Sequence, residues 1–380
     1  MLPRTVGTPS PCTGTAVHRC QGRGVRAGRT GDEPDMSDEF DPACTPPPGL
    51  VLPVRIDGSG RTGPTRGQVR SRAWVSTGSG HHRSADAVAS VEQRILDVAV
   101  RLGPAGAVTG WAALRLLGAA FFDGLARGGL TPLPVPLRTP DRHLRPGSGV
   151  SVVRGAVAPG ATSVAGVAVV AAEQALLDHV RTEQVDRELV VALDMAFAAG
   201  LTSVRRLAAF VDTRTGARGG RRLRRALARA HEQSRSPGEP RLRLIWVLDA
   251  GRPLPLANRP VFDLAGNHLG TPDLLDPDAG VVGEYNGSIH RRAAAARRDA
   301  ERDDLFRRHG LEAFSVVGSD VHDVPRVVER IEATYARATW VPAAERRWTL
   351  TPPPGWASPP SLDERLDHAD WLRERHWLDD

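Results

Sequence analysis

The chain has 380 residues, with 50 basic and 44 acidic side chains, so its formal net charge is +6 and its pI is about 10.3. This length allows about two or three domains, and the basic balance favours a nucleic-acid partner, although Arg-rich codon usage would give the same balance. No run of roughly 18 apolar residues occurs, which excludes a predicted membrane span, and the first residues lack the apolar core of a secretory signal.

Residues 1–50 are rich in Gly, Pro, Thr and Ser without periodicity, which predicts a disordered tail. All three cysteines, Cys12, Cys20 and Cys44, lie in this tail, so we expect no disulfide framework and a cytoplasmic protein. Their spacing matches no zinc-binding pattern. The sequence Met-Ser-Asp-Glu from Met36 is an alternative start of translation.

Residues 51–130 predict a mainly helical first folded segment, with short strands at 51–56 and 72–77. A capping-box start at Ser90 precedes one amphipathic helix, and we expect Thr109 to cap a second through Trp111, Leu114 and Leu117. A helix pair with a tight turn beside strands is consistent with a winged-helix module. Two helices of an ordinary core are the alternative.

Residues 131–232 predict a mixed segment, with short strands over 131–170 and then three helices as far as 211. The strongest basic feature follows, a set of five arginines that would lie along one helix: Arg218, Arg221, Arg222, Arg225 and Arg229. Arginine on one stripe suits phosphate contacts that position a protein on duplex DNA. A solvated linker helix is the alternative interpretation.

The most informative segment is a pair of short strands joined by Pro-Asp-Ala-Gly at 277–280, which predicts a β-hairpin. In the expected register Asp273 lies opposite Glu284, with the two side chains on one face. Carboxylates that close repel each other unless a cation lies between them, and Mg²⁺ is often held by one or two carboxylates. Turn chemistry with solvated acidic residues is the alternative, and a slip of one residue would separate the carboxylates.

The flanks of the hairpin predict further elements. Residues 236–248 form an amphipathic helix with Glu239 in its first turn, and residues 291–309 form a helix that ends at a glycine. A strand at 313–317 and a helix at 324–338 complete the order helix, three strands, helix, strand, helix.

With these motifs in place, residues 236–338 resemble a C-terminal domain of many high-GC Gram-positive bacterial proteins. That domain is related to the very-short-patch repair endonucleases and the PD-(D/E)XK nuclease superfamily. The matching motifs are Ser-Pro-Gly-Glu ending at Glu239, Pro-Asp ending at Asp273, Glu-Tyr-Asn-Gly-Ser-Ile-His from Glu284 to His290, and Asp-Ala-Glu-Arg ending at Arg302. The N-terminal half is similar to the winged-helix domains of abortive-infection antitoxins.

The resemblance implies an α/β (α+β) restriction-endonuclease-like C-terminal domain behind a mainly helical, winged-helix-like N-terminal half. It implies Asp273 and Glu284 as ligands of Mg²⁺ or Mn²⁺, Glu239 as an accessory acid, and His290 as a polar group near the scissile phosphate. Asn286 occupies the position at which the superfamily has Lys and the closer relatives have Asp. The chain contains no lysine, and arginine is always protonated, so no arginine can replace a lysine as a base.

We therefore expect a metal-dependent DNA endonuclease that acts in defence or repair. The first alternative is a non-catalytic DNA-binding regulator of the antitoxin type, and the second is an interaction protein in which Asp273 and Glu284 are turn residues. A homodimer is an open alternative to a monomer, and no membrane partner is expected.

Residues 339–380 contain five of the eight tryptophans and several Pro-Pro pairs. This composition predicts an extended strap that packs its tryptophans over the nuclease-like domain. A tail that binds a partner is the alternative.

Overall fold

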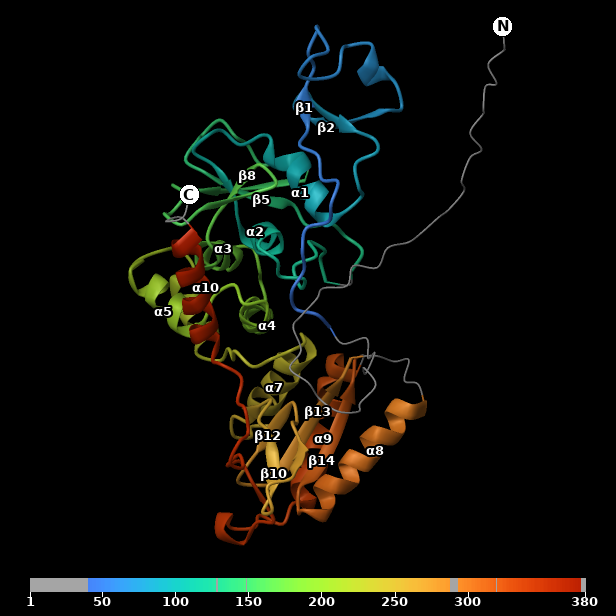
Figure 1. The fold of residues 1–380 in the computed structure, drawn as a ribbon, viewed down its shortest axis with the longest axis vertical. Helices are drawn as coiled ribbons and strands as arrows, with labels where there is room; N and C mark the ends of the chain where they lie inside the picture. The colour runs from blue at the N-terminus through green and yellow to red at the C-terminus, as the bar shows by residue number, and fades with distance from the viewer. Residues whose placement is uncertain (1–39, 128, 148, 288–292, 319, 377–380) are drawn as a thin grey trace, which may run out of the picture. The chain divides into compact units, whose positions relative to one another are not determined.

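The computed structural model describes residues 40–127, 129–147, 149–287, 293–318 and 320–376. Within these ranges the backbone forms ten α-helices and fifteen strands in four sheets (Figure 1), a mixed arrangement compatible with an α+β fold. Of the described helices, none has the length and apolar character needed to cross a membrane. The expected disordered tail falls outside the described residues as far as residue 39.

A small antiparallel sheet comes first, in the order β1-β3-β2. Its strands are β1 (Val54–Arg55), β2 (Trp74–Gly78) and β3 (His81–Ser84). Helix α1 (Val91–Ala99) follows, and the Ser90 hydroxyl accepts a hydrogen bond from the Gln93 N–H at 3.0 Å. This bond satisfies a backbone donor of the first turn and confirms the expected cap.

A five-stranded sheet with the order β6-β5-β4-β8-β7 lies at the centre of the N-terminal half. The short strand β4 (Ala107–Val108) separates α1 from α2 (Gly110–Leu116). The other strands are β5 (Val135–Thr139), β6 (Val150–Arg154), β7 (Thr162–Val164) and β8 (Val167–Val169). Because β4 pairs with both β5 and β8, this sheet crosses the domain boundary expected at residue 130.

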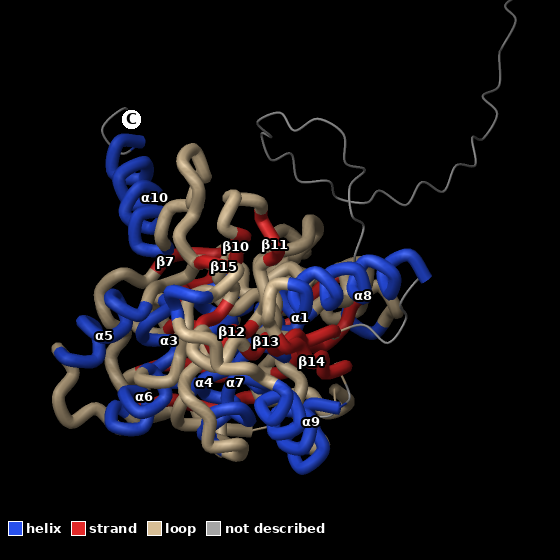
Figure 2. Tube along the Cα trace, turned by 90° about the horizontal axis from the view of Figure 1, so that it is seen from below, coloured by secondary structure: helices blue, strands red, loops and turns tan. Residues whose placement is uncertain are grey.

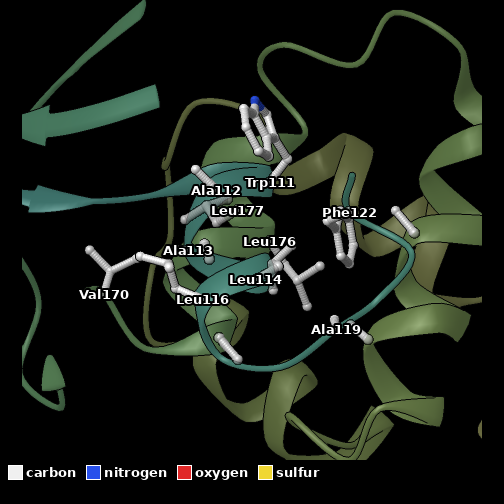
Figure 3. Close-up of a cluster of buried hydrophobic side chains, with 14 of the residues drawn as sticks. Trp111, Ala112, Ala113, Leu114, Leu116, Ala119, Phe122, Val170, Leu176 and Leu177 are labelled. Carbon is white, nitrogen blue, oxygen red and sulfur yellow. The ribbon is translucent and has the colours of Figure 1, made fainter. Parts of the chain in front are cut away.

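Four helices complete this half: α3 (Ala172–His179), α4 (Asp186–Ala198), α5 (Val204–Asp212) and α6 (Gly220–Leu227). Their apolar faces join those of α1, α2 and the sheet in one continuous core. Figure 3 shows part of this core, in which Leu114 of α2 and Leu176 of α3 belong to the same cluster. Residues 51–130 and 131–232 therefore share a core.

The C-terminal half is built on a four-stranded sheet with the order β14-β13-β12-β9. Its elements are α7 (Gly238–Leu248), β9 (Leu256–Ala257), β12 (Leu274–Asp276), β13 (Val281–Asn286), α8 (Ala293–Arg308), β14 (Glu312–Val317) and α9 (Val324–Arg337). The β12–β13 hairpin pairs Leu274 with Gly283, Leu275 with Val282, and Asp276 with Val281, which confirms the expected register. The Asp276 carboxylate accepts hydrogen bonds from the backbone of the 277–280 turn.

Each face of this sheet is covered by different helices because side chains alternate along a strand. Leu274 and Val281 belong to a core with α7 and α9, whereas Leu275 and Val282 belong to a second core with Phe306 of α8. Figure 2 shows β12, β13 and β14 between α8 and the pair α7 and α9. This alternation decides on which face each acidic side chain of the hairpin lies.

The segment after residue 338, which we expected to be an extended strap, also contains a strand and a helix. Strand β15 (Trp348–Thr349) joins a small sheet with β10 (Val261–Asp263) and β11 (His268–Gly270), and Trp348 is buried there. The chain then forms helix α10 (Leu362–His376), whose Leu362 and Leu366 belong to the core of the N-terminal half. Trp377 lies outside the described residues.

A buried ion pair connects α4 to α7. Arg243 and Asp194 are 1% and 0% exposed, and an Arg243 guanidinium nitrogen lies 2.7 Å from an Asp194 oxygen. The Ser234 hydroxyl and the His231 N–H also donate to Asp194, at 2.6 and 2.8 Å. The same carboxylate therefore fixes the segment that leads into α7.

Candidate functional site

Asp273 and Glu284 come from adjacent antiparallel strands. Alternate residues along a strand lie on the same face of the sheet. Asp273, which directly precedes β12, is two positions from Leu275, and Glu284 is two positions from Val282. Both acidic residues therefore belong to the face that α8 covers. Arg302 of α8 lies 3.2 Å from a Glu284 oxygen, and its charge opposes the increase that burial causes in the pKa of Asp273. One guanidinium thus acts on both carboxylates.

Glu239 reaches the same end of the sheet from the first turn of α7. Its carboxylate accepts hydrogen bonds from the Arg235 N–H at 3.0 Å and from the Asn258 amide at 2.7 Å. The close approach of α7 requires glycine at position 238, because a Cβ there would lie 2.0 Å from the Tyr285 ring. The glycine of the Ser-Pro-Gly-Glu motif therefore has a packing role that places Glu239.

Asn258 connects the two acidic segments, and the sequence analysis did not identify it. Its backbone N–H donates to the Asp273 carbonyl at 3.0 Å, and its amide donates to Glu239 and, at 2.8 Å, to the Gln233 carbonyl. Its φ of +49° is a left-handed conformation that asparagine tolerates better than most residues. Its side-chain oxygen is buried and has no hydrogen-bond partner among the described residues. The only signal in the sequence was an asparagine after a short apolar run, which is typical of any turn.

We name Glu239, Asp273, Glu284, Asn258 and Arg302 the carboxylate site. Burial raises the pKa of Asp273 to about 7, and the charge of Glu239 adds to the increase, whereas a bond from the Tyr285 N–H at 2.6 Å opposes it. Burial also raises the pKa of Glu239, against the hydrogen bonds that it accepts. Two carboxylates that repel each other in this way form a place where a cation is stabilised.

The exposed side of the carboxylate site is positively charged. Arg235 is exposed, and its charge opposes the increase that burial causes in the pKa values of Glu239 and Asp273. The Arg302 side chain is 35% exposed. A phosphate near the carboxylates would therefore be within the influence of two arginines whose charges act on Asp273.

One further expected site residue lies on the hairpin strand, and another falls outside the described residues. Asn286 ends β13 and has the same parity as Glu284, so it belongs to the same face. Its carbonyl accepts a bond from the Gly318 N–H at 2.9 Å. His290 lies outside the described residues.

The five expected DNA-binding arginines have different surroundings. Arg221 and Arg225 are exposed on α6, and Arg218 and Arg229 are exposed just before and after it. Arg222 is instead half-buried, with an ion pair to Asp186 and a bond to the Val180 carbonyl at 2.9 Å. Arg222 therefore fixes the loop between α3 and α4.

Carboxylate and amide oxygens are the kinds of donor that Mg²⁺ takes in proteins, and the carboxylate site contains both. Mg²⁺ is commonly held by one or two carboxylates and by water, and the buried oxygen of Asn258 is a further oxygen donor without a partner among the described residues. In the part of the chain that the structure describes, no group of three or more His, Cys, Asp or Glu side chains is close enough to hold a metal. No known protein family, curated protein or solved structure matches this chain.

Proposed function

We propose that this protein is a metal-dependent DNA endonuclease and that the carboxylate site is its catalytic centre. The observation that carries the proposal is the convergence of Glu239 and Asp273 from separate elements. Burial raises the pKa of Asp273 to about 7, and the charge of Glu239 adds to the increase. A pair of repelling acids, with Glu239 buried and Asp273 half-buried, costs stability, and such costs are concentrated at functional sites. The resemblance of residues 236–338 to the PD-(D/E)XK nucleases supports the same assignment.

In this proposal Asp273 and Glu284 hold Mg²⁺ or Mn²⁺, and Glu239 is an accessory acid. The bound ion would polarise a phosphate and lower the pKa of a water molecule. Asn258 orients Glu239 through its amide, and Arg235 and Arg302 stabilise the negative charge of the phosphodiester. Asn286 carries no charge and cannot act as a base.

We further propose residues 236–338 as a restriction-endonuclease-like domain, and the N-terminal half, with the exposed α6 arginines, as the part that positions duplex DNA. The order of α7, the strands β9 to β13, α8, β14 and α9 supports the domain proposal. A cytoplasmic role in defence or repair accords with cleavage of DNA.

The second candidate function is a DNA-binding regulator of the antitoxin type without cleavage. Two observations favour it: Glu284 is ion-paired with Arg302 at 3.2 Å, and the residue at position 286 is a neutral asparagine. An ion-paired carboxylate binds a cation less readily because the guanidinium competes with it.

Nicking of supercoiled plasmid with Mg²⁺ or Mn²⁺ separates the two functions. We expect the wild type to nick DNA and Asp273→Asn to lose the activity, while Asp278→Asn remains active because the Asp278 side chain is 87% exposed in the hairpin turn. Salt-sensitive DNA binding without nicking by either metal would favour the regulator. Absence of both nicking and DNA binding would refute both functions.

A further inference from the structure

A cavity of about 580 Å³ lies in the N-terminal half, apart from the carboxylate site, and Arg218 is the one expected DNA-binding arginine among the described residues that line it. Its walls come from β5, the end of β6 with the following loop, α3, and the turn between α5 and α6. Five arginines and one acidic residue line it: Arg138, Arg154, Arg181, Arg214, Arg218 and Asp178. This is the size of a pocket for a small molecule, and its charge is strongly one-sided.

The single carboxylate of the cavity is already neutralised. Asp178 is 2% exposed, and a guanidinium nitrogen of Arg138 lies 2.8 Å from one of its oxygens. The Thr109 hydroxyl donates to Asp178 at 2.7 Å. Glycine at position 155 leaves room for the Arg138 side chain, since a Cβ there would lie 2.6 Å from the guanidinium. The Arg138–Asp178 pair therefore forms a fixed polar floor without net charge.

The other four arginines of the cavity are not neutralised by a carboxylate of the described residues. Among the described residues, none of Arg154, Arg181, Arg214 and Arg218 forms an ion pair with a carboxylate. Arg154 donates to the Asp141 and Leu144 carbonyls, which holds its guanidinium in place but does not neutralise it.

Arg214 lies against an aromatic ring and has a buried nitrogen. Its guanidinium carbon lies 4.5 Å from the centre of the Phe210 ring, and its Nε is buried without a hydrogen-bond partner in the described part of the chain. A buried charged donor without a partner is costly, and an anion in the cavity would satisfy it. Gly219, with a φ of +90°, packs against Val180 and brings the turn carrying Arg214 close to the end of α3.

From these observations we propose that the cavity binds a phosphate ester of nucleotide size. Guanidinium groups match phosphate oxygens in charge and in hydrogen-bond geometry. Leu177, Val157 and Pro159 provide an apolar part of the wall for a sugar or base. The ligand is either a free nucleotide or a nucleotide unit of a nucleic-acid strand, because both present the same phosphate chemistry.

Calorimetric titration of the full chain with AMP, inorganic phosphate and a 5′-phosphorylated oligonucleotide tests the proposal. Arg181→Gln combined with Arg214→Gln should weaken AMP binding at least ~10-fold, since hydrogen bonds to charged groups are lost. The matched control is Arg72→Gln, which removes an exposed arginine outside the cavity and should leave binding unchanged. Thermal melting of each variant shows whether it is folded.

The competition experiment identifies the source of the phosphate. Displacement of AMP by the phosphorylated oligonucleotide assigns the cavity to a nucleic-acid strand, and failure to displace it assigns the cavity to a free nucleotide; both results support the site. Absence of AMP binding by the wild type at ~1 mM, or equal AMP binding by the folded double variant, overturns it, because an oligonucleotide can also bind the exposed arginines outside the cavity. Asp273→Asn should bind AMP like the wild type, so this result is independent of nuclease activity.

Discussion

Replacing Asp273 with asparagine should stabilise the protein at neutral and alkaline pH. The folded protein keeps this carboxyl beside Glu239 with little hydration, and its pKa is raised from 3.8 to about 7. Asparagine has nearly the same shape, and its oxygen can still accept the 2.6 Å hydrogen bond from the Tyr285 N–H. The substitution therefore removes the repulsion and leaves the local bonding in place.

The sign and size of the effect follow from the two pKa values. Below pH 3.8 Asp273 is protonated in both states, and its titration costs nothing. As the pH rises towards 7, the unfolded chain loses the proton while the folded chain retains it, so stability falls over this window. The difference between 3.8 and about 7 corresponds to at most about 4 kcal/mol. Because the side chain is only half-buried, solvent screens part of this cost, and we expect Asp273→Asn to gain about 1–2 kcal/mol.

Urea denaturation of both proteins at pH 4 and pH 8, in the presence of a chelator, measures this gain. We expect equal stability at pH 4, a more stable variant at pH 8, and no gain for Asp278→Asn, whose carboxylate is exposed. Added Mg²⁺ at pH 8 should stabilise the wild type more than Asp273→Asn, because binding to the folded state adds to stability. A gain that does not change with pH, or a less stable variant at pH 8, would refute the reasoning.

Three further substitutions test other parts of the structure. Arg243→Met should reduce the free energy of unfolding by about 3–5 kcal/mol, measured in urea, because it leaves Asp194 buried without its cation. Gly238→Ala should lower nicking activity with a modest loss of melting temperature, since its methyl group would lie 2.0 Å from the Tyr285 ring and displace the start of α7; full activity would show that α7 need not approach so closely. Deleting residues 362–376 should cost about 2–4 kcal/mol, because α10 buries two leucines in the core of the N-terminal half, and unchanged urea unfolding would contradict that packing.

The sequence by itself determined the hairpin and most of the helices, because these depend on interactions between near neighbours. Alternation with period two and the Pro-Asp-Ala-Gly turn were sufficient to predict the β12–β13 register. The Ser90 cap and the apolar stripe after it were sufficient to predict the start of α1. The face shared by Asp273 and Glu284 follows from the same alternation.

Only the tertiary structure decided which charged groups meet, because such pairs join residues that are distant in the chain. Arg302 forms an ion pair with Glu284, and Arg222 holds the loop before α4 through a bond to the Val180 carbonyl. Asn258 lies between the two acidic segments and donates to Glu239. The raised pKa of Asp273 likewise depends on how closely α7 approaches the sheet, which no local pattern encodes. Strand β4 is too short to have a visible period, so its place at the centre of a five-stranded sheet is set by its partners.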